Sequence, residues 1–300
     1  MPLLMGNDRY AAHELLARPA RSRPELWRLF VGLGLVFAIV FSLSMFVRAA
    51  VGAIAPETLA SPEGVQGNTP ASLLVLLYSF GLVIVATFIA ARAVQKRAPL
   101  GLIGPIGLAL AQFWKVFRLL FVLGIALVLL PPYDMGEALV RNLELGLWLK
   151  LLPLSLGAIL VQTSSEEILF RGYVQQTLAA RFSSPLIWMV LPAVLFGMGH
   201  FVPDNAGGNA WLVAVWAALF GLLMADLTAR AGTLGPAIAV HTINNISAIL
   251  IVSVPDTLSG LSLATTPYPL SNVEQMRGWL MFDLAFMIVS WLAARLAIRR

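Results

Sequence analysis

The sequence of 300 residues contains no cysteine. Disulfide bonds, thiolate metal sites and cysteine nucleophiles are therefore excluded. Charged residues are scarce at 12% of the chain, whereas a soluble domain has about 25%. Histidine occurs only three times, so a site that uses imidazole has few candidates. We also find no internal repeat, which argues against a transporter built from inverted halves.

Apolar residues are abundant, at 59% of the chain, and the mean hydropathy is +0.85. They occur in long uninterrupted runs and not in short alternating segments. Inside a bilayer, only helices and closed barrels satisfy the backbone, and the long runs favour helices. The sequence thus predicts an all-α polytopic membrane protein, with one helical bundle filling the chain.

We expect about eight transmembrane helices, because each crossing needs about 20 residues. Glycines and a proline make residues 100–112 an interfacial or poorly packed segment, so the count depends on residues 100–130. Arginines at the membrane edges predict that both termini are cytoplasmic. The spans are expected near residues 27–47, 72–91, 119–130, 145–167, 186–202, 210–228, 234–254 and 279–298.

Two adjacent carboxylates, Glu166 and Glu167, lie within this apolar sequence. Charges at membrane depth are costly and by default indicate function. Neighbouring residues of a helix point roughly 100° apart, so the two carboxylates cannot face one target equally. Glu167 lies four residues before Arg171, close enough for an ion pair. Glu166 is then left to act as a general base. The alternative is an ion-pair cluster that holds a helix end.

Two further apolar stretches each contain one histidine. Phe196-Gly197-Met198-Gly199-His200 ends in an imidazole, and its glycines allow helices to approach closely. His241 and Asn245 are four residues apart and share a helix face. An imidazole and an amide on one face can bind a metal, hold a carbonyl oxygen or stabilise an oxyanion. The alternative in both stretches is structural hydrogen bonding between helices.

Other polar residues show less organisation. Asp226 is expected to form a simple ion pair with Arg230, and neither Asp283 nor Gln162 belongs to a pattern. His13 lies in the polar N-terminal stretch, where we expect it to be solvated. Because three separate helices each contribute a strongly polar group, we predict that Glu166, His200 and His241 share one site.

These motifs together resemble the CAAX protease and bacteriocin-processing family (CPBP, or Abi) of intramembrane proteases, also called type II CAAX prenyl endopeptidases. The family pattern is Glu-Glu-x-x-x-Arg, then Phe-x-x-x-His, then His-x-x-x-Asn. All three elements occur here in that order, within about residues 160–250. The N-terminal third of the chain is not covered by the resemblance.

The resemblance implies hydrolysis of a peptide bond within the membrane. Glu166 would activate water with help from His200, while His241 and Asn245 would bind the scissile carbonyl and its oxyanion. Glu167 and Arg171 would support the first motif. Whether zinc takes part is left open by the resemblance. If zinc is present, its ligands would be Glu166, His200 and His241. These ligands are scattered, unlike the compact His-Glu-x-x-His of zincins, which favours a Glu/His-activated water.

The predicted organisation follows. Residues 1–26 form a cytoplasmic tail, 27–142 the N-terminal transmembrane helices, 143–254 the catalytic core, and 255–300 a loop and the last transmembrane helix. Expected partners are membrane lipids and a membrane-associated peptide or protein substrate, CAAX-like or not, and no nucleic acid. The expected location is a bacterial inner membrane. Two alternatives stay open: a proton-coupled transporter that uses the same polar residues, and a non-catalytic membrane partner or immunity protein.

The predicted topology contains one conflict of depth. Glu166 lies towards the cytoplasmic half of its span, whereas His200 falls near the outer end of its helix. A single site requires the chain between them to change depth. We predict that residues 172–181 form an amphipathic or re-entrant segment.

Overall fold

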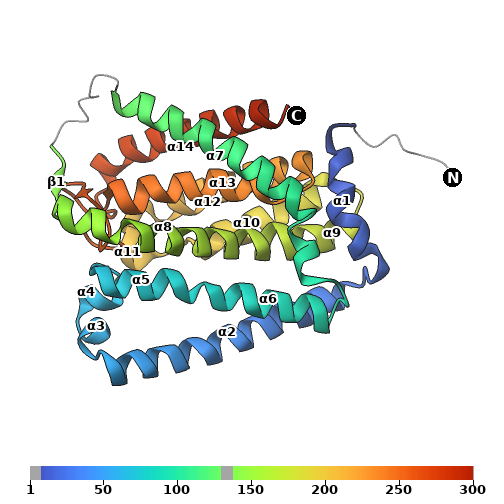
Figure 1. The fold of residues 1–300 in the computed structure, drawn as a ribbon, viewed down its shortest axis with the longest axis horizontal. Coiled ribbons are helices and arrows are strands. Elements are labelled where there is room, and N and C mark those ends of the chain that lie inside the picture. Colours follow the sequence, from blue (N-terminus) through green and yellow to red (C-terminus); the bar gives the residue numbers. More distant parts are fainter. Residues whose placement is uncertain (1–7, 130–137, 300) are drawn as a thin grey trace.

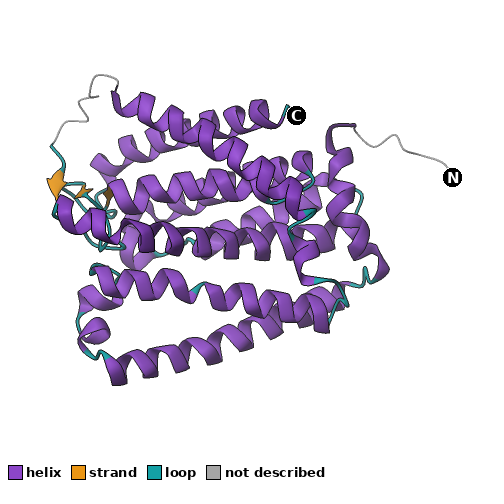
Figure 2. Cartoon of the chain, in the orientation of Figure 1, coloured by secondary structure: helices purple, strands orange, loops and turns teal. Residues whose placement is uncertain are grey.

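The computed structural model describes residues 8–129 and 138–299. It is a bundle of long helices running side by side (Figures 1 and 2). Among the described residues, six helices are long and apolar enough to cross a membrane, and two shorter apolar helices accompany them. The six are Leu26–Ile54, Pro62–Ala93, Ile106–Leu127, Leu145–Arg181, Pro203–Ala231 and Val273–Ile298, and the shorter two are Leu186–Gly199 and Gly235–Ile251. The protein is thus an all-α polytopic membrane protein, as predicted.

Regular elements follow one another with few long loops. The longer helices are α2 (Leu26–Ile54), α5 (Pro70–Ser79), α6 (Gly81–Ala93), α7 (Ile106–Leu129), α8 (Leu145–Glu167), α10 (Leu191–Gly199), α12 (Ala210–Ala231), α13 (Gly235–Asn245) and α14 (Val273–Ile298). The shorter α-helices are α1 (Glu14–Ala17), α3 (Glu57–Ala60), α4 (Pro62–Val65), α9 (Gln176–Arg181) and α11 (Pro203–Ala206). Tighter 3₁₀ turns are η1 (Asp8–His13), η2 (Arg18–Ser22), η3 (Pro99–Leu102) and η6 (Gly207–Asn209). Wider π-helical segments are η4 (Ile168–Gln175), η5 (Leu186–Val190) and η7 (Ile246–Ile251).

A small sheet joins loops at the end of the bundle opposite the N-terminal segment (Figure 1). Its strand order is β1-β3-β2, with β1 antiparallel and β2 parallel to β3. Asn142 donates hydrogen bonds from its amide to the carbonyl oxygens of Ser259 and Ser262. The loop between β2 and α14 therefore closes this end of the bundle. The strands are β1 (Val140–Arg141), β2 (Val252–Ser253) and β3 (Ala264–Thr265).

The polar motifs are carried by helices at the centre of the bundle. There α10 packs on α12, and α13 packs on α7 and α8. Gly197 makes the first contact possible, since a Cβ there would lie 2.5 Å from the carbonyl oxygen of Ala214. Gly235 allows α13 to approach the backbone of Ala109 on α7. The glycine of the Phe-x-x-x-His motif thus has the close-packing role that the sequence predicted.

Helix α8 does not end at the paired carboxylates. It continues through η4 and α9 as one helix of 37 residues, Leu145–Arg181, which at 1.5 Å per residue is about 55 Å long. Residues 171–178 are all buried against other parts of the protein. The predicted amphipathic or re-entrant segment at 172–181 is therefore wrong, because tertiary packing covers every face of the helix from 171 to 178 and leaves only its last turn more open.

This long helix resolves the conflict of depth. Beyond Glu167 the chain rises through η4 and α9, of eight and six residues, and then turns. It returns through η5 and α10, of five and nine residues, to His200. Each arm is about 20 Å long, so the two motifs arrive at a similar depth.

Two other expectations need correction. Residues 106–112 form the first turns of α7, a continuous apolar helix, so the third span begins at Ile106 and not after Arg118. His13 is only 4% exposed, and its ring lies 4.7 Å from that of Trp188. The N-terminal segment is therefore docked on the bundle, and this histidine is buried instead of solvated.

Candidate active site

Glu167 occupies the centre of the polar site. It comes from the last turn of α8 and its side chain is fully buried. Its Oε1 accepts hydrogen bonds from Arg171 Nη1 at 3.0 Å and from His241 Nδ1 at 2.8 Å. The predicted pair of Glu167 and Arg171 is present. The contact to His241 joins the first motif directly to the third.

Glu166 lies beside this pair but is engaged differently. Its Oε2 is 3.5 Å from His241 Nε2, and the carboxylate side chain is 14% exposed, unlike the buried Glu167. Among the described residues, neither that oxygen nor Oε2 of Glu167 has a hydrogen-bond partner. Two adjacent carboxylates thus have two environments, as the helical geometry predicted. Glu167 joins the first motif to the third, while Glu166 faces the second nitrogen of His241.

The imidazole of His241 has a defined orientation. A carboxylate only accepts hydrogen bonds, so His241 Nδ1 donates to Glu167. The other nitrogen, Nε2, therefore faces Glu166. The ring of Phe220 packs against the imidazole at 4.8 Å in an edge-on arrangement. Both the hydrogen bond and the ring contact fix the imidazole before any substrate arrives.

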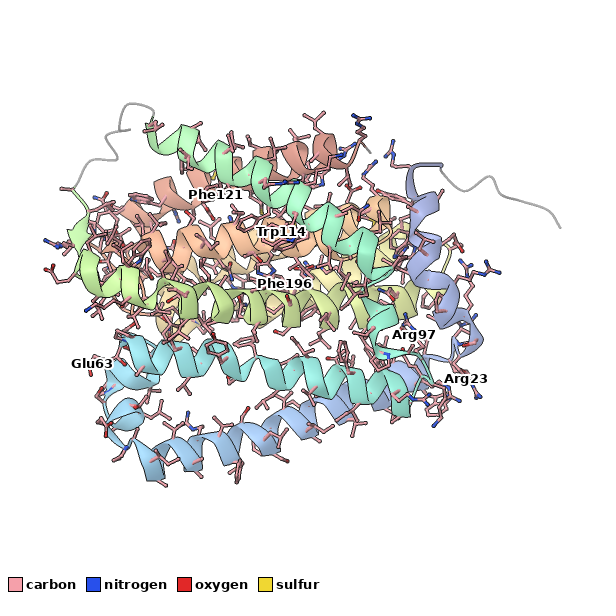
Figure 3. All side chains as sticks on the ribbon, viewed as in Figure 1. Arg23, Glu63, Arg97, Trp114, Phe121 and Phe196 are labelled. Atoms are coloured by element: carbon pink, nitrogen blue, oxygen red, sulfur yellow. The ribbon has the colours of Figure 1, made fainter. Side chains whose placement is uncertain are left out.

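His200 joins the site through an aromatic contact. Its Nδ1 lies 2.9 Å from the carbonyl oxygen of Phe196 and must donate to it, because a carbonyl cannot donate. Its Nε2 is then free to accept a proton. The Phe196 ring lies 4.5 Å from the His200 ring and 6.2 Å from that of His241. Phe196 lies away from both ends of the bundle (Figure 3).

Arg171 extends from η4, the π-helical segment that begins immediately after Glu167. Such wider turns are frequent at functional sites. The guanidinium is 1% exposed and donates from Nη2 to the carbonyl oxygen of Gly221 at 3.0 Å. It also lies 4.8 Å from the centre of the Phe196 ring. One buried cation thus contacts the first motif, the second motif and α12.

Asn245 binds a residue that sequence reasoning did not select. Its Nδ2 donates to Gln162 Oε1 at 2.7 Å. One turn away, the hydroxyls of Thr163 and Thr242 lie 3.0 Å apart. The available signal was spacing, because Gln162 precedes Glu166 by four residues and so shares its helix face.

Asp226 makes more contacts than the sequence predicted. Its predicted pair with Arg230 is present at 2.7 Å, but it also accepts hydrogen bonds from the Tyr10 hydroxyl and the Trp291 indole. This carboxylate connects the N-terminal segment, α12 and α14. A cavity of about 350 Å³ adjoins it. The cluster holds the fold together and does not include the motif residues.

The positions of the site's side chains bear on the predicted zinc site. Within residues 8–129 and 138–299, no group of three His, Cys, Asp or Glu side chains is placed so that it could hold a metal ion. Glu167 engages Nδ1 of His241, so only Nε2 of that ring could face a metal. The site as it stands does not fit zinc, and we derive no step through a metal.

Fold and site together define a helical membrane protein with a buried glutamate–histidine centre. Residues 148–247 match the family model described as type II CAAX prenyl endopeptidase Rce1-like. The matched segment contains all three motifs, so this match confirms the predicted resemblance. The family is one of proteases, which supports an enzyme at that level.

A relative extends beyond the matched segment. The uncharacterized protein YyaK of Bacillus subtilis (strain 168) is 24% identical over 265 residues, covering 81% of this chain and 83% of the relative. No solved structure matches the chain. The description of this relative names no activity. The similarity therefore shows that related sequence continues beyond the matched segment, but it adds nothing about function.

Proposed function

We propose that this protein is an intramembrane endopeptidase that hydrolyses a peptide bond of a membrane-associated substrate through a water activated by Glu166 and His200. One observation carries the proposal. Glu167 is fully buried and its Oε1 accepts hydrogen bonds from both Arg171 and His241, whereas the side chain of Glu166 beside it is 14% exposed and faces His241 Nε2 at 3.5 Å. A purely structural ion-pair cluster would have buried and hydrogen-bonded both carboxylates alike.

The proposed reaction assigns each step to a group on this chain. Water attacks the scissile carbonyl carbon and gives its proton to Glu166 or to Nε2 of His200. The carbonyl oxygen becomes an oxyanion, which the second N–H of the Asn245 amide would stabilise, together with Nε2 of His241 when that ring is protonated on both nitrogens. The C–N bond then breaks, and the proton passes to the leaving amine. Proton transfer and oxyanion stabilisation together complete the hydrolysis.

Burial supports this chemistry. The polar site lies in a bundle with apolar outer faces, so water reaches it only locally and its charges act in a medium of low dielectric constant. Electrostatic stabilisation of an oxyanion is stronger in such a medium than in bulk water. The fixed orientations of His241 and Arg171 mean that little reorganisation is needed when charge develops.

We also propose that the protein lies in a bacterial inner membrane with both termini cytoplasmic. Both ends of the described chain lie at one end of the bundle (Figure 1). The labelled Arg23 and Arg97 lie at that same end, and Glu63 at the other (Figure 3). Positive residues favour the cytoplasmic side. A Bacillus relative supports a bacterial host. The proposed partners are membrane lipids and a peptide or protein substrate, and nucleic acid is not among them.

The decisive test compares the wild-type protein with Glu166→Gln in liposomes that contain a membrane-anchored peptide. We expect cleavage by the wild type and a loss of at least a hundredfold in the variant, with an unchanged melting temperature. Glu144→Gln is the matched control, because Glu144 is an exposed carboxylate paired with Arg141. Full activity of Glu166→Gln would overturn the assignment.

Substrate class is tested in the same assay. One peptide ends in a prenylated cysteine motif, and a second has the same sequence without the lipid. A third is a transmembrane peptide that lacks the motif. The pattern of cleavage decides between a CAAX-type substrate and a general membrane peptide, and failure on all three would favour the non-catalytic partner.

A further inference from the structure

Gln162 lies one helical turn before Glu166 on α8 and is 7% exposed. Its side-chain oxygen accepts a hydrogen bond of 2.7 Å from Asn245 Nδ2. Asn245 in turn lies one helical turn after His241 on α13. The two amides therefore form the contact next to the one between Glu166 and His241, across the same pair of helices.

The bond determines which way the amide of Asn245 points. The oxygen of Gln162 can only accept, so the NH₂ group of Asn245 must face it. The other end of that amide, Oδ1, accepts a hydrogen bond from Asn244 Nδ2 at 3.3 Å. One N–H of Asn245 is thereby used, and the second remains for another acceptor. An isolated amide could turn over and present its oxygen in the same place.

That orientation matters for the chemistry of the site. An oxyanion is stabilised by an N–H donor and repelled by a carbonyl oxygen. If Asn245 turned over, its oxygen would replace its nitrogen beside the reacting carbonyl. A neighbour that accepts from Nδ2 opposes this, because Asn245 can then turn over and keep the bond only if that neighbour turns over as well. Gln162 is the only side chain among the described residues that accepts from Nδ2.

We propose that Gln162 is a positioning residue of the proteolytic site, which holds the amide of Asn245 with its N–H group towards the oxyanion. The inference rests on the proposed function and adds a residue to it. A positioning role differs from a purely structural one. In a structural role, a buried hydrogen bond between membrane helices would contribute about 0.6–2 kcal/mol to stability and would not affect turnover.

A neighbouring bond supplies the matched control. Thr163 and Thr242 join the same two helices through a buried bond of 3.0 Å. Thr163→Val removes that bond with little change of volume, while Gln162→Met removes the amide with little change of length. Both variants lose one interhelical hydrogen bond, but only one of them frees Asn245.

The experiment measures kcat, KM and melting temperature for the wild type, Gln162→Met, Thr163→Val and Glu166→Gln on the same peptide in liposomes. We expect Gln162→Met to lower kcat by about ten- to a hundredfold, a part of the 10²–10³ typical of losing an oxyanion donor. Its KM should change by less than threefold. Thr163→Val should keep a kcat within about twofold of wild type.

A double-mutant cycle tests the route of the effect. If Gln162 acts through Asn245, Gln162→Met should lower kcat no further in an Asn245→Ala background. Equal losses of kcat in Gln162→Met and Thr163→Val, or an unchanged kcat in Gln162→Met, would overturn the inference while the proposed function stands. If the wild-type protein cleaves no peptide, both the inference and the proposed function fail. This outcome is recognised because the wild type and Glu166→Gln then show the same absence of cleavage.

Discussion

Glu167 Oε1 and His241 Nδ1 lie 2.8 Å apart although 74 positions separate them in the chain. The same oxygen holds Arg171 at 3.0 Å. One buried carboxylate thus neutralises a cation on its own helix and orients an imidazole on another. Breaking a buried ion pair from one side typically costs about 3–5 kcal/mol, because an uncompensated charge remains.

The first prediction concerns a variant in which the carboxylate of Glu167 loses its charge. Glu167→Gln should lower the free energy of unfolding by about 3–5 kcal/mol, since Arg171 remains buried without a counter-ion. Glu167→Gln with Arg171→Met should recover part of that stability, because neither charge is then left alone. Chemical unfolding in detergent measures both values. Additive losses in the double variant would contradict the coupling.

A second prediction concerns the packing of α10 on α12. Gly197→Ala should destabilise the protein by about 1–3 kcal/mol and lower activity, because the new methyl group meets the backbone of Ala214 and Ala218. Gly199→Ala is the control in the same helix, since no atom lies within 4 Å of its added Cβ. Melting temperatures should differ clearly between the two variants. Equal melting temperatures would show that α10 can shift without cost.

A third prediction follows from His13. Burial without a hydrogen-bond partner for Nε2 lowers the pKa of this histidine to about 4 from the usual 6.5. Nearby Glu14 raises this pKa and Arg21 lowers it, each by less than burial does. Above pH 6.5 the ring is neutral in both the folded and the unfolded states. As the pH falls from 6.5 to 4, only the unfolded state takes up the proton, so the folded state loses up to about 3 kcal/mol.

This pH effect is measured as a difference between two proteins. His13→Phe keeps a ring against Trp188 but cannot be protonated. The melting temperature of the wild type should fall more steeply than that of the variant between pH 6.5 and 4. Identical pH profiles would show that His13 leaves its buried position before it is protonated.

The fourth prediction addresses metal dependence. Because no described group of three His, Asp or Glu side chains is placed to bind a metal, cleavage should persist after treatment with a zinc chelator. The assay compares activity before chelation, after it, and after zinc is added back. Activity lost to the chelator and restored by zinc would mean that the ligand side chains rearrange around a metal.

The sequence alone determined the helical class, the three motifs and the ion pair between Glu167 and Arg171. Each depends on local properties. Long apolar runs in a bilayer leave few alternatives to a helix, and residues four apart on a helix are neighbours whatever surrounds them. The different environments of Glu166 and Glu167 followed from the same local geometry.

Only the tertiary structure decided which side chains meet across helices. The contacts of His241 with Glu167 and of Asn245 with Gln162 depend on the relative depth of α8 and α13. That depth is set by side-chain packing and close backbone approaches such as the one at Gly235. His13 illustrates the same limit, since a polar stretch of sequence does not reveal that its histidine docks against Trp188. Local patterns fix the elements of this site, and long-range packing fixes its geometry.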